Sequence, residues 1–271
     1  FRKDGPKNRL REQDIHRIVD TFSRQMELPG YSRMVPVTEI SDPKNDYNLN
    51  LPRYIDSTEP EDLQDIEAHL HGGIPDPDIE GLTRYWQVIP AVRKALFKEL
   101  RPGYSQLSVA ASQLKETIFA HPEFTSYNES ATKLFEKWKK STLPTLQALS
   151  KGGHPKVLIE KISEDLLTTF EKAALIDPYD IYQHLMDYWS ESFQDDCYLI
   201  TSEGWKEAAQ PQLILSEKSQ KSKVKPDFTL GKKKYSAELI PTSLIISRYY
   251  SKEQAEIDSL EAEIASIQQE I

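Results

Sequence analysis

The sequence has 271 residues and a formal net charge of −9, with 34 Lys and Arg against 43 Asp and Glu. A chain of this length can bury a hydrophobic core, in one large or two smaller domains. No apolar run approaches the roughly 18 residues of a membrane-spanning helix, so we expect no membrane partner. The single cysteine excludes an internal disulfide framework and a cysteine-rich zinc site, and favours a cytoplasmic location. Because the chain starts at Phe1 rather than Met and stops within a helical pattern, we expect both ends to be cut.

The N-terminal part of the sequence predicts one helix followed by two short strands. Apolar residues within 11–24 recur at i, i+3, i+4 and i+7, as on one face of a helix, and Gly30 then breaks the pattern. Apolar and polar residues alternate over 35–40 and again over 47–51, which favours short edge strands. The residues of the helical face are Ile15, Ile18, Val19 and Phe22.

The middle of the chain is predicted to be a helical bundle. Thr58–Glu61 has the form of a capping box, and the helix that it starts is expected to end at Gly72-Gly73. A second helix is expected to open at Asp76, and Pro90 is expected to break or bend it before the apolar positions Val92, Leu96 and Leu100. Periodic apolar residues predict three further helices, over 124–138, 155–170 and 178–193.

Beyond residue 195 the sequence predicts short β elements and then a coiled-coil-like helix. Tyr198–Ile200, Leu213–Leu215 and Leu239–Ile240 are short apolar runs. Near the end, apolar residues recur at steps of 3 and 4, as on the a/d seam of a coiled coil. Two heptads are too short to be stable alone, so we expect this seam to need a partner. The seam consists of Ile257, Leu260, Ile264, Ile267 and Ile271.

Charge is distributed in blocks. Nine acidic residues and no Lys or Arg occur between Asp56 and Glu80, a stretch that would repel phosphates. Seven Lys and one Asp occur between Lys218 and Lys234. The Lys232-Lys233-Lys234 run therefore predicts either a DNA contact or a solvated hairpin, and both interpretations stay open.

Three stretches carry residues with catalytic or metal-binding chemistry, and each has a simpler structural interpretation. His69 and His71 differ by two positions, so they point to different faces of a helix, and we expect them at its C-terminal end. Asp195-Asp196 is interpreted as a solvated helix end rather than as a cation site. Asp177-Pro178-Tyr179 resembles the Asn/Asp-Pro-Pro-aromatic motif of amino-group methyltransferases but lacks the second proline, and we interpret it as a helix cap. Common phosphate-binding and hydrolytic motifs are absent, so we assign no catalytic, cofactor-binding or metal-binding residue.

Several stretches together resemble modification subunits of type I restriction-modification systems. NDYNLNLPRYI at 45–55 resembles the segment that closes the catalytic domain, and Asn8-Arg9-Leu10 resembles the tail of the methyltransferase fold. Two other stretches are similar to the helical regions that follow. They are HGGIP at 71–75, with Asp78-Ile79 and Tyr85-Trp86, and DIYQHLMDYW at 180–189, with Gln194-Asp195-Asp196 and Tyr198-Leu199-Ile200.

The resemblance implies part of a DNA adenine-N6 methyltransferase that uses S-adenosylmethionine. Its implied partners are a specificity subunit, a second modification subunit, a restriction subunit and DNA. The family's donor-binding loop and Pro-Pro motif are missing, so we expect this chain alone to bind no S-adenosylmethionine and to be inactive. We expect a mostly α-helical fold with small β elements. The expected parts are the methyltransferase tail at 1–56, a helical domain at 57–195, a β and loop region at 196–250 and the coiled-coil-like helix at 251–271.

Two rival interpretations belong to other functional classes. The chain could be an independent helical scaffold or adaptor, which predicts a natural start codon near Phe1. It could also be a hydrolase with a metal held by Asp195, Asp196 and a histidine, which predicts metal-dependent stabilisation.

Overall fold

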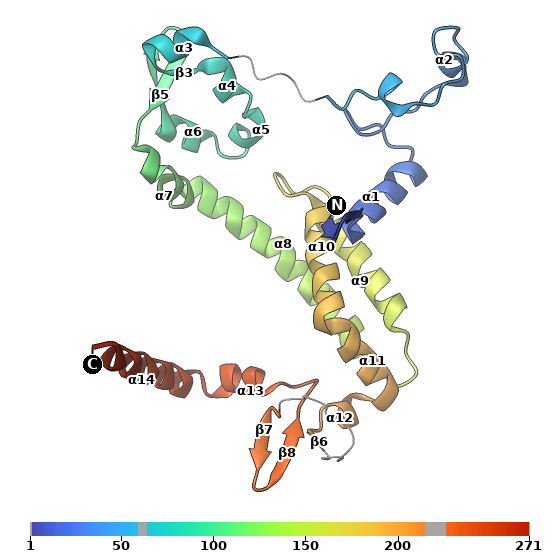
Figure 1. The fold of residues 1–271 in the computed structure, drawn as a ribbon, viewed down its shortest axis with the longest axis vertical. Helices are drawn as coiled ribbons and strands as arrows, with labels where there is room; N and C mark the ends of the chain where they lie inside the picture. Colours follow the sequence, from blue (N-terminus) through green and yellow to red (C-terminus); the bar gives the residue numbers. More distant parts are fainter. Residues whose placement is uncertain (1, 59–63, 215–225, 271) are drawn as a thin grey trace. The chain divides into compact units, whose positions relative to one another are not determined.

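The computed structural model describes residues 2–58, 64–214 and 226–270 (Figure 1). Over these residues the chain is mostly helical with small antiparallel sheets, as the sequence predicts at this level. Its residues form two compact units, one of Phe1–Leu143 with Lys161–Asp187 and one of Pro144–Glu160 with Tyr188–Ile271. Among the described residues, no helix combines the length and the apolar character that crossing a lipid bilayer requires. Most of the capping box expected at Thr58–Glu61 lies outside the described residues.

The first unit begins with a hairpin of β1 (Arg2–Asp4) and β2 (Lys7–Arg9), which the sequence analysis did not predict. The expected helix follows as α1 (Glu12–Ser23). The prediction of two short strands over 35–40 and 47–51 is wrong. Residues 37–40 form the short helix α2 (Val37–Ile40), and the second stretch ends in the 3₁₀ turn η1 (Leu51–Arg53). Both turns lie beside a proline, whose fixed φ suits the start of a helical turn.

A small sheet in the middle of the chain corrects the prediction of a purely helical region there. Gly72-Gly73 ends α3 (Ile66–His71) as expected. Gly73 has a φ of 101°, which L side chains rarely adopt, and a Cβ there would lie 3.1 Å from Leu100 Cδ2, so the position favours glycine. Leu100 lies in a strand, not in the helix expected to reach it. The break at Pro90 is confirmed, but the part expected before it as one helix is two short helices. Ile89, Val92 and Leu96 form a buried core. The elements are β3 (Ile74–Pro75), α4 (Asp76–Glu80), α5 (Thr83–Trp86), α6 (Pro90–Leu96), β4 (Phe97–Arg101) and β5 (Tyr104–Leu107), with strand order β3-β5-β4.

Long helices follow and confirm the periodic segments of the sequence. After η2 (Ala111–Gln113) and α7 (Leu114–Phe119) come α8 (Pro122–Gln147) and α9 (Pro155–Phe170). The Trp138 indole of α8 donates to the Ile162 carbonyl of α9 at 3.0 Å, which fixes how these helices meet. The helix expected over 178–193 is α10 (Pro178–Tyr188) followed by η3 (Trp189–Phe193), a turn of π-helix.

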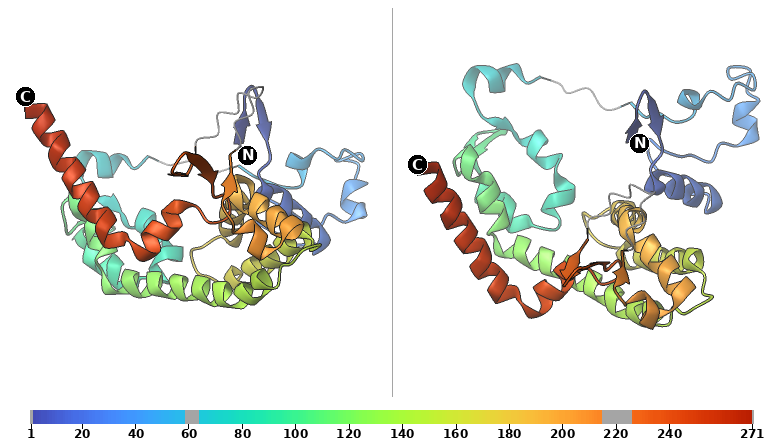
Figure 2. Two further views of the ribbon diagram at one scale, coloured as in Figure 1. Left: turned by 90° about the horizontal axis from the view of Figure 1, so that it is seen from below. Right: turned by 60° about the horizontal axis from the view of Figure 1, so that its bottom comes forward.

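In the second unit, Tyr198–Ile200 is helical, so the prediction of a β element there is wrong. These residues belong to α11 (Gln194–Glu203), where Cys197 and Ile200 are buried three positions apart on one face. Of the run Leu213–Leu215, Leu213 lies in the strand β6 (Gln212–Leu213), Ile214 follows it and Leu215 lies outside the described residues, while Leu239–Ile240 forms no strand. The remaining elements are α12 (Trp205–Ala208), β7 (Phe228–Leu230), β8 (Lys233–Ser236), α13 (Thr242–Tyr249) and α14 (Ser251–Glu270), with strand order β6-β8-β7. Figures 1 and 2 show α14 as one continuous helix after α13.

Candidate functional site

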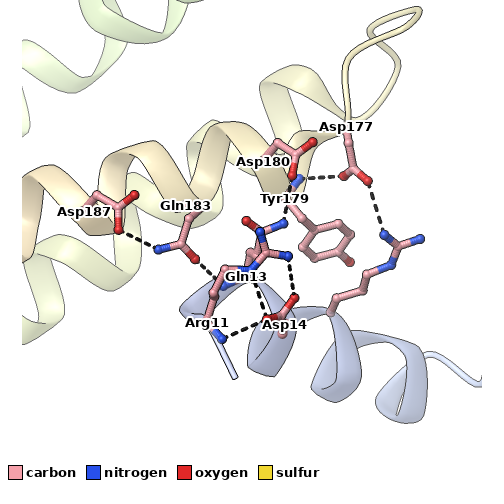
Figure 3. A network of polar contacts seen from close by, with 9 residues as sticks. Arg11, Gln13, Asp14, Asp177, Tyr179, Asp180, Gln183 and Asp187 are labelled. Atoms are coloured by element: carbon pink, nitrogen blue, oxygen red, sulfur yellow. Dashed lines mark hydrogen bonds and ion pairs between the residues drawn. The ribbon is translucent and has the colours of Figure 1, made fainter. Parts of the chain in front are cut away.

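A network of polar side chains joins α1 to α10 in the first unit, and Figure 3 shows these side chains pointing toward one another. Its centre is Gln13, which is only 8% exposed. The Gln13 amide nitrogen Nε2 donates to Asp180 at 2.8 Å, and its backbone N–H donates to Oε1 of Gln183 at 3.0 Å. Gln183 is held in turn by a bond to Asp187 at 2.8 Å. The second bond of Gln13 therefore satisfies a first-turn N–H of α1, which has no partner within its own helix.

An ion pair at the start of α1 borders this network. The Arg11 guanidinium binds both carboxylate oxygens of Asp14, at 2.9 and 3.1 Å, and the Arg11 backbone N–H donates to the same carboxylate at 2.8 Å. These hydrogen bonds, the guanidinium first, hold the pKa of Asp14 well below its usual value. The negative charge also lies in the first turn of α1, where the helix dipole favours it.

The Asp177-Pro178-Tyr179 stretch is confirmed as a helix cap. The Asp177 carboxylate accepts the Tyr179 N–H at 2.9 Å at the start of α10. It also pairs with Arg17 of α1 at 3.2 Å, while the Tyr179 hydroxyl donates to Asp20 at 2.8 Å. Burial, followed by this hydrogen bond, raises the pKa of Tyr179. Both side chains are thus used to hold α1, and neither is free to clamp a base.

The apolar face of α1 is exposed, whereas its polar face is buried against α9 and α10. The four apolar side chains of the face are between 46% and 84% exposed, and Phe22 is the most exposed of them. They include Ile18 and Phe22, which line an open groove of about 770 Å³ together with Tyr31, Met34 and Leu51. An amphipathic helix normally buries its apolar face and exposes its polar face. The four side chains are Ile15, Ile18, Val19 and Phe22.

The predicted seam of α14 is helical and has no partner among the described residues. Four of its side chains share one face of the helix, and each is between 48% and 56% exposed. They are Ile257, Leu260, Ile264 and Ile267. Ile271 lies outside the described residues.

The lysine run forms one side of a hairpin. Lys233 and Lys234 lie in β8 and pair with Leu230 and Thr229 of β7, and Lys232 lies in the turn. All three lysines are exposed. Successive residues of a strand point to opposite faces, so Lys233 and Lys234 leave the hairpin on opposite sides. The lysines at 218–225 lie outside the described residues, and the DNA contact stays a prediction.

The described residues include no group of three or more His, Cys, Asp or Glu placed to hold a metal ion. His69 is at the end of α3 as expected, with Nε2 3.0 Å from Oε1 of Gln64. Asp195 and Asp196 were expected at a solvated helix end. They lie instead in the first turn of α11, directly after η3. Burial and then the neighbouring Asp195 raise the pKa of Asp196. The metal centre that the hydrolase interpretation requires is therefore not found among the described residues.

Comparison with known proteins finds similarity in the N-terminal segment. Residues 1–63 match the model of the N-6 DNA Methylase family. Over 63 residues, the chain is 40% identical to the type I restriction enzyme MjaVII methylase subunit of Methanocaldococcus jannaschii. That match covers 23% of this chain and 11% of the relative, so the chain spans only a small part of the relative's length. No solved structure matches. The predicted resemblance to type I methylase subunits is thus confirmed in the N-terminal segment. The similar stretches noted at 71–86 and 180–200 lie outside the family match at 1–63 and stay predictions.

Proposed function

We propose that this chain is part of the modification subunit of a type I restriction-modification enzyme and serves its assembly. The whole subunit would transfer a methyl group from S-adenosylmethionine to adenine N6 in DNA, in the cytoplasm. The observation that carries the proposal is the match of residues 1–63 to N-6 DNA methylases, including a type I methylase subunit. The remaining residues, from 64 onward, would bind the partner subunits.

The groove beside α1 lacks the carboxylate that a nucleotide-like methyl donor commonly uses. Carboxylates commonly hold the ribose hydroxyls of nucleotide cofactors in α/β folds. The groove beside α1 is lined mainly by apolar residues with Arg33, and no carboxylate lines it. We therefore assign no step of methyl transfer to these residues, and we propose that they are inactive without the rest of the subunit.

The exposed apolar face of α1 has a natural occupant under this proposal. The 63 matched residues make up only 11% of the type I methylase subunit, so a subunit of that kind has a much larger body than this segment. Burying Phe22 and its three neighbours on α1 against that body would be stabilising, by about 25 cal/mol for each Å² of apolar surface. The polar network with α10 would then join the methylase body to the helices that follow.

We assign the contact with the specificity subunit to the seam of α14. Apolar a/d residues bind a partner helix by fitting into holes between its side chains, and the α14 seam is about half exposed. A second modification subunit, the restriction subunit and DNA complete the proposed assembly. The lysines of the β8 hairpin are a candidate DNA contact within it.

The experiment replaces Ile264 and Ile267 with Asp and measures the affinity of the chain for the specificity subunit by isothermal titration calorimetry. We expect at least a tenfold loss, since two charges would enter an apolar interface. The matched control is Ala255→Asp with Ala262→Asp, which adds the same charges at exposed positions of α14 outside the seam. Equal affinity of the two variants would contradict docking through the seam.

The DNA contact has a separate test in the assembled enzyme. Replacing Lys232, Lys233 and Lys234 with Gln should flatten the dependence of log K for DNA binding on log salt, because fewer counterions are released. An unchanged slope would leave these lysines as a solvated hairpin.

A further inference from the structure

The charges beside the α14 seam are almost all of one sign. With Ile257 and Ile264 at heptad position a, and Leu260 and Ile267 at d, the flanking e and g positions follow from the sequence. Over 254–270 these positions hold only Glu and Gln, without a single Lys or Arg. They are Gln254, Glu256, Glu261, Glu263, Gln268 and Glu270.

The acidic side chains beside the seam face solvent. Glu256, Glu261 and Glu263 are exposed, and the described structure shows no ion pair to any of the three. Their negative charge is therefore available to a partner along the same face as the half-exposed apolar seam.

This charge pattern disfavours a second copy of α14 as the partner. In a parallel pair of helices, g residues of one helix meet e residues of the other, so Glu256 would meet Glu261 of the other copy. In an antiparallel pair, g meets g and e meets e, and like charges would meet again. Like charges across a helix interface are unfavourable, and at low salt they are screened little.

We infer that the α14 seam is built for a different helix, one whose apolar a/d residues are flanked by Lys or Arg. The inference rests on the proposed docking function of α14 and adds to it the chemistry of the partner helix. The acidic flanks of the seam would disfavour self-association and favour a partner with basic flanks.

The test uses the 271-residue chain and two synthetic helical peptides of four heptads. Both peptides carry Ile at a and Leu at d, and they differ only in having Lys or Glu at every e and g position. Fluorescence anisotropy at about 20 mM salt should show the Lys peptide binding on the order of tenfold more tightly than the Glu peptide. In about 1 M salt the ratio should fall toward one, because exposed charges are then screened.

Charge reversal in the chain itself should abolish the preference. The variant Glu261→Lys with Glu263→Lys should bind the two peptides with about equal affinity, because two Lys then offset the two remaining Glu at the e and g positions. The matched control places Lys at 259, 262, 265 and 266, which are exposed and lie outside the a, d, e and g positions. Each Glu→Lys change alters the charge twice as much as a Lys at a neutral position, so both variants change the net charge equally. The control should keep the preference for the Lys peptide.

Three outcomes would overturn the inference, and they can be told apart from failure of the proposed function. Equal affinity for both peptides would show that flanking charge selects nothing. A dimer of the chain in analytical ultracentrifugation that Ile264→Asp with Ile267→Asp dissociates would assign the seam to a second copy. A control variant that loses the preference as fully as Glu261→Lys with Glu263→Lys would show an effect of net charge alone. By contrast, correct peptide selection without any binding to the specificity subunit would contradict only the proposed function.

Discussion

Gln13 offers the sharpest test of how α1 is attached to the helices that follow. The variant Gln13→Glu keeps the size of the side chain but replaces the amide donor, 2.8 Å from Asp180, with a carboxylate. We expect the variant to weaken the attachment of α1 to α10, because the hydrogen bond becomes a repulsion between like charges.

The size of the effect follows from the geometry of the pair. A hydrogen bond to a charged group contributes about 1.5–3 kcal/mol. Two carboxylates that relax to roughly 5 Å repel by about 1–3 kcal/mol at effective dielectric constants between water and a protein surface. Asp180 is exposed and can regain water, so the lower part of both ranges applies. We therefore expect the opening free energy of α1 to fall by about 2–3 kcal/mol.

Amide hydrogen exchange measures this quantity, since it reports local opening of a helix. Exchange in α1 should quicken by about 30-fold to 150-fold at pH 7, where each 1.4 kcal/mol is a factor of ten. As the pH falls, the difference from the unsubstituted chain should shrink already above pH 4, because burial and the Asp180 carboxylate raise the pKa of the new carboxyl and the protonated side chain can donate again. The control Gln25→Glu makes the same chemical change at an exposed position just beyond α1 and should have little effect. Unaltered exchange in the Gln13→Glu variant would refute the assigned role of this bond.

Three further predictions concern stability and reactivity. Ile162→Ala in α9 removes a side chain that is 1% exposed and should lower the free energy of unfolding by about 2–5 kcal/mol in urea titrations, whereas Val157→Ala, at 61% exposure, should cost far less. Arg11 lowers the pKa of Asp14, so this pair stabilises the fold above the ordinary carboxyl pKa, and the stabilisation is lost as the pH falls. Asp14→Asn should therefore reduce the difference in unfolding free energy between pH 7 and pH 3. An unchanged difference would count against the pair. Burial raises the pKa of the Cys197 thiol to about 11, so iodoacetamide at pH 8 should modify it slowly in the folded chain and rapidly in urea, and equal rates would contradict its burial.

The long helices could be predicted from the sequence because their apolar residues recur over several turns. The segment 155–170 is helical at both predicted ends, where Pro155 suits the first helical position and the apolar pattern stops at Phe170. Short apolar runs lack such a pattern. Tyr198–Ile200 was predicted as β but is part of α11, because three residues cannot distinguish a strand from one turn of a buried helix.

The periodicity of apolar residues in α1 does not determine which face of the helix packs against the rest of the chain. Apolar spacing predicted the helix correctly but not which face contacts the rest of the chain. The structure uses the polar face, through Gln13 and Asp20, and these bonds join residues more than 150 positions apart. A sequence pattern carries no information on such distant pairs, so the network could not be predicted. The heptad spacing of α14 likewise predicted the helix correctly, but spacing alone does not identify its partner.

The most direct measurement for the account as a whole compares assembly with methyl transfer in the purified 271-residue chain. Calorimetry would titrate the chain with the specificity subunit and, separately, with S-adenosylmethionine, and a labelled methyl donor would report transfer to DNA. The account predicts binding to the specificity subunit, with neither binding of the donor nor labelling of DNA. A chain that binds S-adenosylmethionine and methylates adenine by itself would contradict it.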